Sequence, residues 1–279
     1  MQLNENTIFI LDCDNTLWRW IQYAGPAYKA MCKVLSGIAG KEFLETAAAM
    51  KTFYTSVGTL EHEGLVQGLQ KAGFFKHLPH FNLRETILLA QAAFSEERDR
   101  HFKVFDGITE MVRELQALDV RLLLLTDATR YQAMRRLARS RLEGFEKMYC
   151  MPAPVFEQMP EDFGATGRLP SIPYEELPEE KPHTDLERIL GLTRAEIQER
   201  VVIAGDSVKK DVALAERFEC LVAHAAYGLA SEEDIDAIRD FAPDDVANRN
   251  TVTASTASSY HRMVTANHPS EILAKVRAA

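Results

Sequence analysis

The chain has 279 residues, a formal net charge of −9 at pH 7, 46% hydrophobic residues and 26% charged residues. This length can bury a full core and is typical of one large domain or two unequal ones, and the composition is that of a globular protein. The excess of negative charge repels nucleic acid and anionic lipid, so neither nucleic acid nor a membrane surface is an expected partner.

The four cysteines, Cys13, Cys32, Cys150 and Cys220, are scattered and form no C-x-x-C pair. This spacing favours reduced thiols in a cytoplasmic protein over a disulfide framework. The first residues lack the basic and apolar regions of a signal peptide, and no apolar run reaches about 18 residues. We therefore expect neither secretion nor membrane insertion.

The first predicted strand spans residues 7–11 and is followed by two carboxylates, Asp12 and Asp14. On an extended chain, residues at this i, i+2 spacing face the same side. Like charges at the end of a buried strand need a cation, a shared proton or a reacting group, which makes this a candidate site. A Ca²⁺ loop begins similarly but needs Gly and Glu where this chain has Leu17 and Tyr23. A turn rich in Asp and Asn is the other interpretation of this motif alone.

Residues 18–104 are predicted to form a helical insertion after the first strand. Helical patterns cover residues 27–35, 41–54 and 83–94, and the next convincing strand begins only at residue 120. The insertion therefore separates the first strand from the rest of its sheet.

Short apolar runs then alternate with helical patterns. The predicted strands span residues 120–125, 148–151, 201–204 and 220–225, and the predicted helices span residues 108–118, 131–142, 185–190, 195–200 and 208–218. Two helix starts carry capping signals, Thr193 with Glu196 and Ser231 with its acidic followers. Near-continuous hydrophobic strands are typical of parallel sheets covered on both faces. The fold class is therefore α/β, with a doubly wound parallel sheet.

A proline-rich stretch interrupts this alternation. Seven of the chain's eleven prolines lie within residues 152–182. Because this density excludes a long helix or a central strand, we expect residues 154–178 to form an irregular loop, or a small excursion, on the edge of the sheet.

Three further polar segments lie where a doubly wound sheet binds its ligands, beyond the carboxyl ends of strands. They are Thr126 with Asp127, the Lys181-Pro182 pair, and the run Gly205-Asp206-Ser207 that continues to Asp211. Together with the first strand, the chain offers a carboxylate pair, a hydroxyl, a lysine and a second acidic pair, in that order.

These four segments resemble the four motifs of the haloacid dehalogenase superfamily. The matching residues are Asp12-x-Asp14-x-Thr16, Thr126, Lys181 and Gly205-Asp206-Ser207-x-x-x-Asp211. The insertion resembles, by position and helicity, the C1 cap of small-molecule phosphatases in this superfamily. The resemblance implies a Rossmann-like core formed by residues 1–17 and 105–279, and a helical cap formed by residues 18–104.

The resemblance also implies an activity, a phosphatase that hydrolyses a small phosphorylated metabolite through an aspartyl-phosphate intermediate. Asp12 would be the nucleophile, and Asp14 would protonate the leaving oxygen and later deprotonate the attacking water. Thr126, the backbone amide of Asp127 and Lys181 would bind the phosphate oxygens. A loop cation without a catalytic role is the alternative for Lys181.

The implied cofactor is Mg²⁺, which prefers octahedral oxygen ligands. The resemblance implies that the carboxylates of Asp12 and Asp206 and the backbone carbonyl of Asp14 bind it. Thr16, Ser207 and Asp211 would support the site. Asp211 would steady Lys181 or a metal-bound water, and the alternative for it is a helix residue paired with a neighbouring lysine.

The resemblance leaves alternative functions open. Dehalogenating members lack an acid at the position of Asp14, so its presence favours phosphoryl transfer. A phosphomutase or phosphotransferase would use the same intermediate, and a non-catalytic protein could bind a phosphorylated ligand with the same core. The last alternative does not explain why a nucleophile and an acid occur together, and the sequence does not predict an oligomeric state.

Overall fold

The computed structural model describes residues 1–60, 62, 64–152, 171–244, 246 and 260–279, and these residues form two compact units. The first unit takes the described residues of Met1–Arg19, Lys103–Leu229 and Val252–Ala279. The second takes the described residues of Trp20–Phe102 and Ala230–Thr251.

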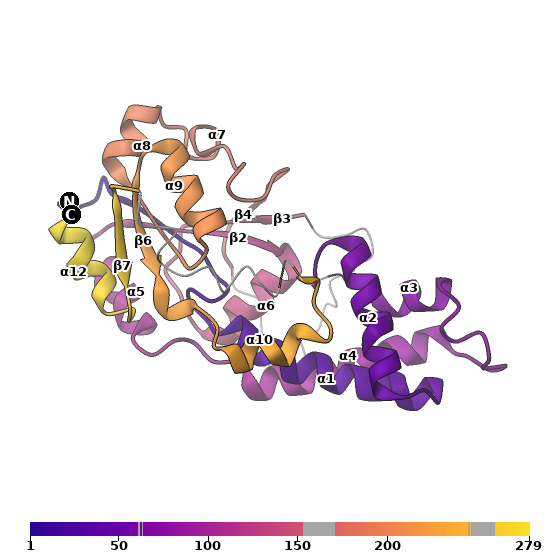
Figure 1. Ribbon diagram of the computed structural model, residues 1–279. Coiled ribbons are helices and arrows are strands. Elements are labelled where there is room, and N and C mark those ends of the chain that lie inside the picture. Colours follow the sequence, from indigo (N-terminus) through magenta and orange to yellow (C-terminus); the bar gives the residue numbers. More distant parts are fainter. Residues whose placement is uncertain (61, 63, 153–170, 245, 247–259) are drawn as a thin grey trace. The chain divides into compact units, whose positions relative to one another are not determined.

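The first unit is built on a seven-stranded sheet with the order β4-β3-β2-β1-β5-β6-β7 (Figure 1). The strands are β1 Ile8–Leu11, β2 Arg121–Thr129, β3 Lys147–Met151, β4 Tyr174–Glu176, β5 Val201–Gly205, β6 Leu221–Ala225 and β7 Met263–Ala266. Each pair of neighbouring strands is parallel, and β1 lies at the centre, where Leu11 pairs with Leu124 of β2 and Ala204 of β5. The polar residues at the carboxyl ends of β1, β2 and β5 therefore meet above the centre of the sheet. The predicted fold class is confirmed.

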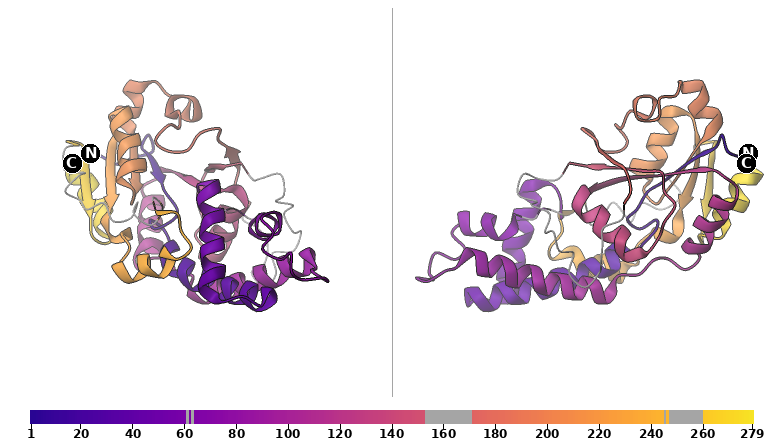
Figure 2. Two further views of the ribbon diagram at one scale, coloured as in Figure 1. Left: turned by 45° about the vertical axis from the view of Figure 1, so that its right-hand side comes forward. Right: turned by 180° about the vertical axis from the view of Figure 1, so that it is seen from behind.

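Helices cover both faces of this sheet, as the two views of Figure 2 show. One face carries α7 Leu186–Leu190, α8 Arg194–Arg200 and α9 Ala213–Phe218. The other carries α5 Ile108–Ala117, α6 Arg130–Ser140 and α12 Glu271–Ala278. Covering on both faces explains why β1 and β5 are apolar at every position instead of alternating.

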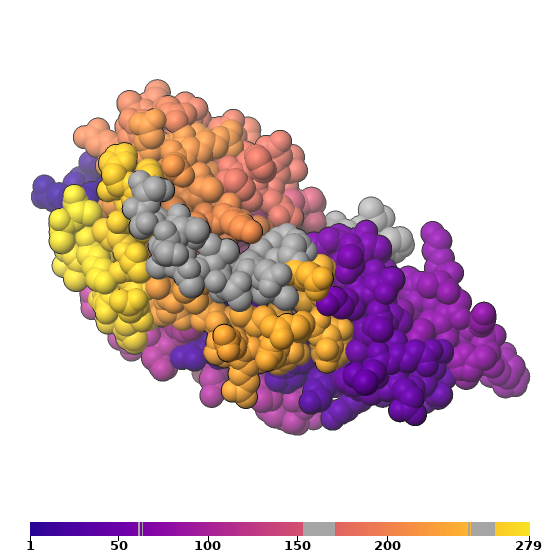
Figure 3. Space-filling view, viewed as in Figure 1, coloured from indigo at the N-terminus to yellow at the C-terminus, as the bar shows by residue number. Residues whose placement is uncertain are grey.

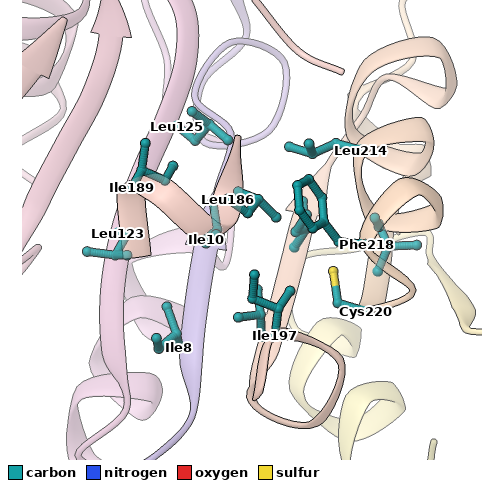
Figure 4. Packing of buried hydrophobic residues seen from close by; sticks show 14 of the residues in the cluster. Ile8, Ile10, Leu123, Leu125, Leu186, Ile189, Ile197, Leu214, Phe218 and Cys220 are labelled. Carbon is teal, nitrogen blue, oxygen red and sulfur yellow. The ribbon is translucent and has the colours of Figure 1, made fainter. Parts of the chain in front are cut away.

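The core between the sheet and α7 to α9 is a single apolar cluster (Figure 4). Ile8 and Ile10 of β1 face it, since alternate strand residues share a side, and they pack with Ile197 of α8 and Phe218 of α9. Burying one such side chain stabilises the fold by about 1.5–3 kcal/mol. This packing holds β1 in place and thereby fixes the backbone position of Asp12, the residue that follows the strand.

The five predicted strands are confirmed, as are the capping boxes at Thr193 and Ser231. Two edge strands, β4 and β7, were not predicted, because each is three or four residues long and only partly buried. Part of the proline-rich stretch, residues 153–170, lies outside the described residues. The described part is not wholly irregular, since Tyr174–Glu176 forms β4, although it does lie at the sheet edge as expected.

The helix predicted over residues 208–218 has two parts. Its first turn, η2 Val208–Val212, is π-helical, and α9 follows it. In η2 the carbonyl oxygen of Ser207 accepts backbone N–H bonds from three consecutive residues, Lys210, Asp211 and Val212. Single π-helical turns are frequent at functional sites, because they change which side chains point inward.

The second unit is helical, with α1 Trp20–Ala39, α2 Phe43–Val57, α3 Leu65–Lys71, α4 Leu83–His101 and α10 Glu232–Arg239. Tyr28 of α1 lies at its centre, with ring centroids 5.5 Å from Tyr54, 5.0 Å from Phe94 and 6.2 Å from Phe241. The last contact belongs to a segment that the sequence analysis placed in the core domain. The division into units thus differs there from the predicted domains, because α10 and Phe241 pack on α1.

The two ends of the chain lie together in the first unit. The amino group of Met1 donates to the carbonyl oxygen of Val276 at 3.1 Å, and the indigo and yellow residues are neighbours in Figure 3. Among the described residues, no helix combines the length and the hydrophobicity needed to cross a bilayer.

Candidate active site

Asp12 lies where β1 ends, at the centre of the sheet. Its backbone N–H donates to the carbonyl oxygen of Ala204 in β5 at 2.8 Å, which continues the strand pairing through this residue. Its side chain is nearly buried, and one carboxylate oxygen accepts a hydrogen bond from Nζ of Lys181 at 2.5 Å. The other lies 3.4 Å from the hydroxyl of Thr16. The candidate nucleophile is thus held on a rigid strand end next to a cation.

Lys181 joins two of the sequence segments. Its Nζ also donates to Asp211 at 2.7 Å, and both of these side chains are buried. Burial by itself would lower the pKa of Lys181, but the carboxylates of Asp12 and Asp211 hold that pKa well above its usual value. Lys181 is therefore a permanent cation in the site.

Two carboxylates contact this ammonium group, and a third, that of Asp206, lies close to both of them. Ligand oxygens of Asp12, Asp206 and Asp211 all lie within 4.8 Å of one another, and all three residues are buried. Burial raises the pKa of Asp12 to about 7, although the charge of Lys181 acts to lower it. Burial and the negative charge of Asp12 raise the pKa of Asp206 well above its usual value. One ammonium does not balance three carboxylates, and hard oxygen ligands at this spacing fit a divalent cation such as Mg²⁺.

The local backbone explains how Asp211 reaches this cluster. The π-helical turn carries Asp211 back toward the end of β5, where its second carboxylate oxygen accepts the N–H of Ser207 at 3.0 Å. A Cβ atom at Gly205 would lie only 2.2 Å from Cγ of Asp211. Glycine at position 205 is therefore a steric requirement for this placement.

Thr126 and Asp127 come from the end of β2. Because Leu124 pairs with Leu11, Thr126 lies just beyond the end of β1, and its hydroxyl accepts the N–H of Ala128 at 3.1 Å. The carboxylate of Asp127 accepts the backbone N–H of Lys181 at 3.0 Å, so β2 and the lysine segment are joined. The predicted role of the Asp127 amide toward phosphate stays a prediction.

Lys210 was missed by the sequence analysis. Its Nζ donates to Asp127 at 2.6 Å and to Glu180 at 3.1 Å. Lys210 therefore forms a second link between β2 and the lysine segment, residues 180–182. Burial would raise the pKa of Asp127, but the two lysines, Lys181 and Lys210, lower it below its usual value. The only signal in the sequence was the position of Lys210 directly before Asp211.

Asp14 is turned to other partners. Its two carboxylate oxygens accept hydrogen bonds from Nε1 of Trp18 at 2.5 Å and from Nη1 of Arg136 in α6 at 2.6 Å. The acidic cluster consists of other residues, so the part of Asp14 that was expected at the metal, its backbone carbonyl, stays a prediction. The bond to Arg136, 122 residues away, could not be read from the sequence.

The end of β6 and the residues that follow it contact the backbone of the site, and the sequence analysis missed these contacts as well. A Cβ atom at Gly228 would lie 1.8 Å from the carbonyl oxygen of Asn15 and 2.9 Å from Cβ of Asp206. The hydroxyl of Tyr227 donates to the carbonyl oxygen of Thr16 at 3.0 Å, and Nε2 of His224 donates to that of Asp206 at 3.1 Å. These contacts fix the backbone of the first and fourth motifs.

Without a bound cation, we expect the free energy of unfolding to fall as the pH rises from about 4 to about 7. The pKa of Asp12 rises from its ordinary 3.8 to about 7 on folding. In this range the folded chain keeps a proton that the unfolded chain has released, so each increase in pH favours unfolding. Urea unfolding in the presence of a chelator, at about pH 5 and about pH 7.5, measures this loss.

The Asp12→Asn variant is the control for this pH dependence, because it lacks the titrating carboxylate and keeps all other groups. Its free energy of unfolding should fall less over the same range. Equal pH dependence of the two proteins would contradict the assignment of the raised pKa to Asp12.

Comparison with known proteins identifies a related family. Residues 7–219 match a family model described as a hydrolase, haloacid dehalogenase-like hydrolase. The match covers the four motifs and most of both units. No curated protein sequence matches the chain.

Solved structures show the same fold. A haloacid dehalogenase-like family hydrolase from Xanthomonas campestris superposes with a TM-score of 0.54 at 16% identity and covers 100% of this chain and 96% of that chain. A 2-haloacid dehalogenase from Pseudomonas syringae gives 0.52 at 16% identity, with 98% of each chain covered. A Thermotoga maritima protein named as a β-phosphoglucomutase gives 0.52 at 16% identity, with 98% and 99% covered. At this identity the likeness concerns the fold alone.

Proposed function

Because this chain belongs to the haloacid dehalogenase-like hydrolases, we propose that it is a Mg²⁺-dependent phosphatase that hydrolyses a small phosphorylated metabolite. Asp12 is the nucleophile of this proposal, and the phosphoryl group is carried transiently on its carboxylate. The family accounts for a hydrolase, and the side chains of the first unit support the choice of phosphate monoesters.

The observation that carries the proposal is the charge distribution around Asp12. A carboxylate that attacks a phosphate dianion meets repulsion, which only nearby cations can offset. Lys181 lies 2.5 Å from Asp12, and the cluster of Asp12, Asp206 and Asp211 supplies oxygen ligands for a further cation. A surface turn or a simple binding loop does not need this combination at the end of a buried strand.

In this proposal, Asp12 attacks the phosphorus atom of the substrate. One carboxylate oxygen of Asp12 forms the new bond to phosphorus as the bond from phosphorus to the leaving oxygen breaks. Lys181 and the hydroxyl of Thr126 hold the phosphoryl oxygens and offset their charge. When bound, Mg²⁺ held by Asp12, Asp206 and the carbonyl of Asp14 would supply most of the remaining positive charge.

Asp14 handles the protons in this proposal. It protonates the leaving oxygen in the first step and takes a proton from the water that hydrolyses the phosphorylated Asp12 in the second. The position two residues after the nucleophile brings it to the same strand end, and its side chain is partly exposed, with about 23% of its surface accessible. This exposure supports access of water to the same group in the second step.

The test is turnover of para-nitrophenyl phosphate by the purified chain. We expect release of inorganic phosphate with Mg²⁺, loss of this activity on chelation and recovery when Mg²⁺ is returned. A panel of sugar phosphates, phosphoglycolate and nucleoside monophosphates then identifies the substrate class.

Three results with these substrates would contradict the proposal. Binding of a phosphorylated compound without release of inorganic phosphate would indicate a binding protein. Isomerisation of a sugar phosphate without release of inorganic phosphate would indicate a mutase. Release of phosphate that persists unchanged after chelation would exclude the proposed role of Mg²⁺.

A further inference from the structure

The carboxylate of Asp14 is held on both of its oxygens. Nε1 of Trp18 donates to Oδ1 and Nη1 of Arg136 donates to Oδ2, at 2.5 and 2.6 Å. Trp18 is fully buried and Arg136 is 5% exposed. A donor on each oxygen gives the carboxyl group one orientation and removes its free rotation about the Cβ–Cγ bond.

Arg136 has a position that packing alone does not explain. It lies on the inner side of α6, and arginine is seldom this deeply buried unless its charge is matched by a partner. The partner is a carboxylate of the candidate active site, on a different part of the chain. By contrast, the neighbouring Arg135 is half-buried, and its guanidinium lies 3.5 Å from the hydroxyl of Tyr131 on the same helix.

We propose that Arg136 is a positioning residue that acts on the reaction through Asp14. This inference rests on the proposed function, in which Asp14 gives a proton to the leaving oxygen. As the proton leaves, Asp14 becomes a carboxylate beside a guanidinium that is already in place, so no group has to reorganise to offset the new charge. When Asp14 takes a proton from water in the second step, Arg136 again keeps the accepting oxygen in a fixed direction.

The leaving group separates this role from a structural one. A good leaving group such as para-nitrophenolate needs little help from an acid, whereas an alkoxide needs a proton as the bond to phosphorus breaks. We expect Arg136→Met to lower kcat by about 10- to 100-fold on an alkyl phosphate such as glycerol 3-phosphate and by much less on para-nitrophenyl phosphate, with little change in KM. Asp14→Asn should show the same pattern with a larger loss.

A double-mutant cycle tests whether Arg136 acts through Asp14. In the Asp14→Asn background, Arg136→Met should cause no further loss with either substrate. Arg136→Lys keeps the charge but not the geometry of the guanidinium and should recover part of kcat on the alkyl phosphate. Arg135→Met, the adjacent arginine on the same helix, is the control and should leave kcat unchanged. Thermal unfolding shows whether each variant is folded, and Arg136→Lys carries the test if Arg136→Met is not.

The results that overturn the inference are distinct from those that overturn the function. If Arg136→Met costs the same factor for both leaving groups, or the same factor with and without Asp14, Arg136 is structural and the phosphatase assignment stands. If Asp14→Asn itself shows no dependence on the leaving group, Asp14 is not the acid, and both the proposed mechanism and this inference fail.

Discussion

The Asp12→Asn variant is expected to lose turnover of para-nitrophenyl phosphate by about 10⁴-fold or more. An amide is a poor nucleophile and cannot carry the phosphoryl group as an acyl phosphate. The fold should survive, because the change removes one of three crowded carboxylates whose repulsion and burial raise the pKa of the remaining Asp206. The expected result is therefore loss of activity without loss of stability.

Two measurements check this expectation. Steady-state kinetics give kcat, and mass spectrometry after rapid quenching should find a phosphorylated natural chain and an unmodified variant. Asp106→Asn is the matched control, because the Asp106 side chain is 93% exposed in the same unit. Turnover by Asp12→Asn well above background would show that another residue is the nucleophile.

The Lys181→Met variant is expected to lose roughly 3–5 kcal/mol of unfolding free energy in addition to its activity. The side chain of Lys181 is 3% exposed, and its ammonium group contacts both Asp12 and Asp211. Removing one partner of a buried ion pair leaves the other charge without compensation. Here two carboxylates would lose their cation at once.

Urea unfolding measures this loss, and Mg²⁺ should restore part of it. A cation that binds only the folded chain stabilises it. Once the cation concentration exceeds the dissociation constant, the gain in unfolding free energy grows with the logarithm of the ratio of the two. Lys209→Met, an exposed lysine on the same turn as Lys210, is the control and should change stability by no more than about 0.5 kcal/mol. A loss below about 1 kcal/mol for Lys181→Met would show that Lys181 does not offset the buried charge of Asp12 and Asp211.

These two variants probe one physical feature, a buried site with more carboxylates than cations. Asp12, Asp206 and Asp211 are drawn together by strand ends and by the π-helical turn, while Lys181 supplies one positive charge. A divalent cation would supply the missing positive charge. The second cation, Lys210, is committed to Asp127 and Glu180 and serves to hold the lysine segment in place.

The sequence predicts those strands whose burial on both faces of the sheet requires an apolar run. Strands β1, β5 and β6 and residues 122–125 of β2 lie inside a covered sheet and are therefore almost continuously apolar, which is visible without a structure. The edge strands β4 and β7 are short and partly exposed, and such segments carry no comparable signal. The same holds for α10, whose start was predicted but whose packing on α1 was not.

The sequence by itself determined which chemical groups this protein brings to the site: Asp12, Thr126 and Asp206 each follow a predicted strand, and Lys181 follows the proline-rich stretch, in a fixed order. Only the tertiary structure decided their partners: Arg136 and Trp18 on Asp14, Lys210 on Asp127, and the close approach of Gly228 to Asn15. The physical reason is that hydrophobic periodicity is a local property, whereas an ion pair or a steric contact between distant residues depends on how the elements pack.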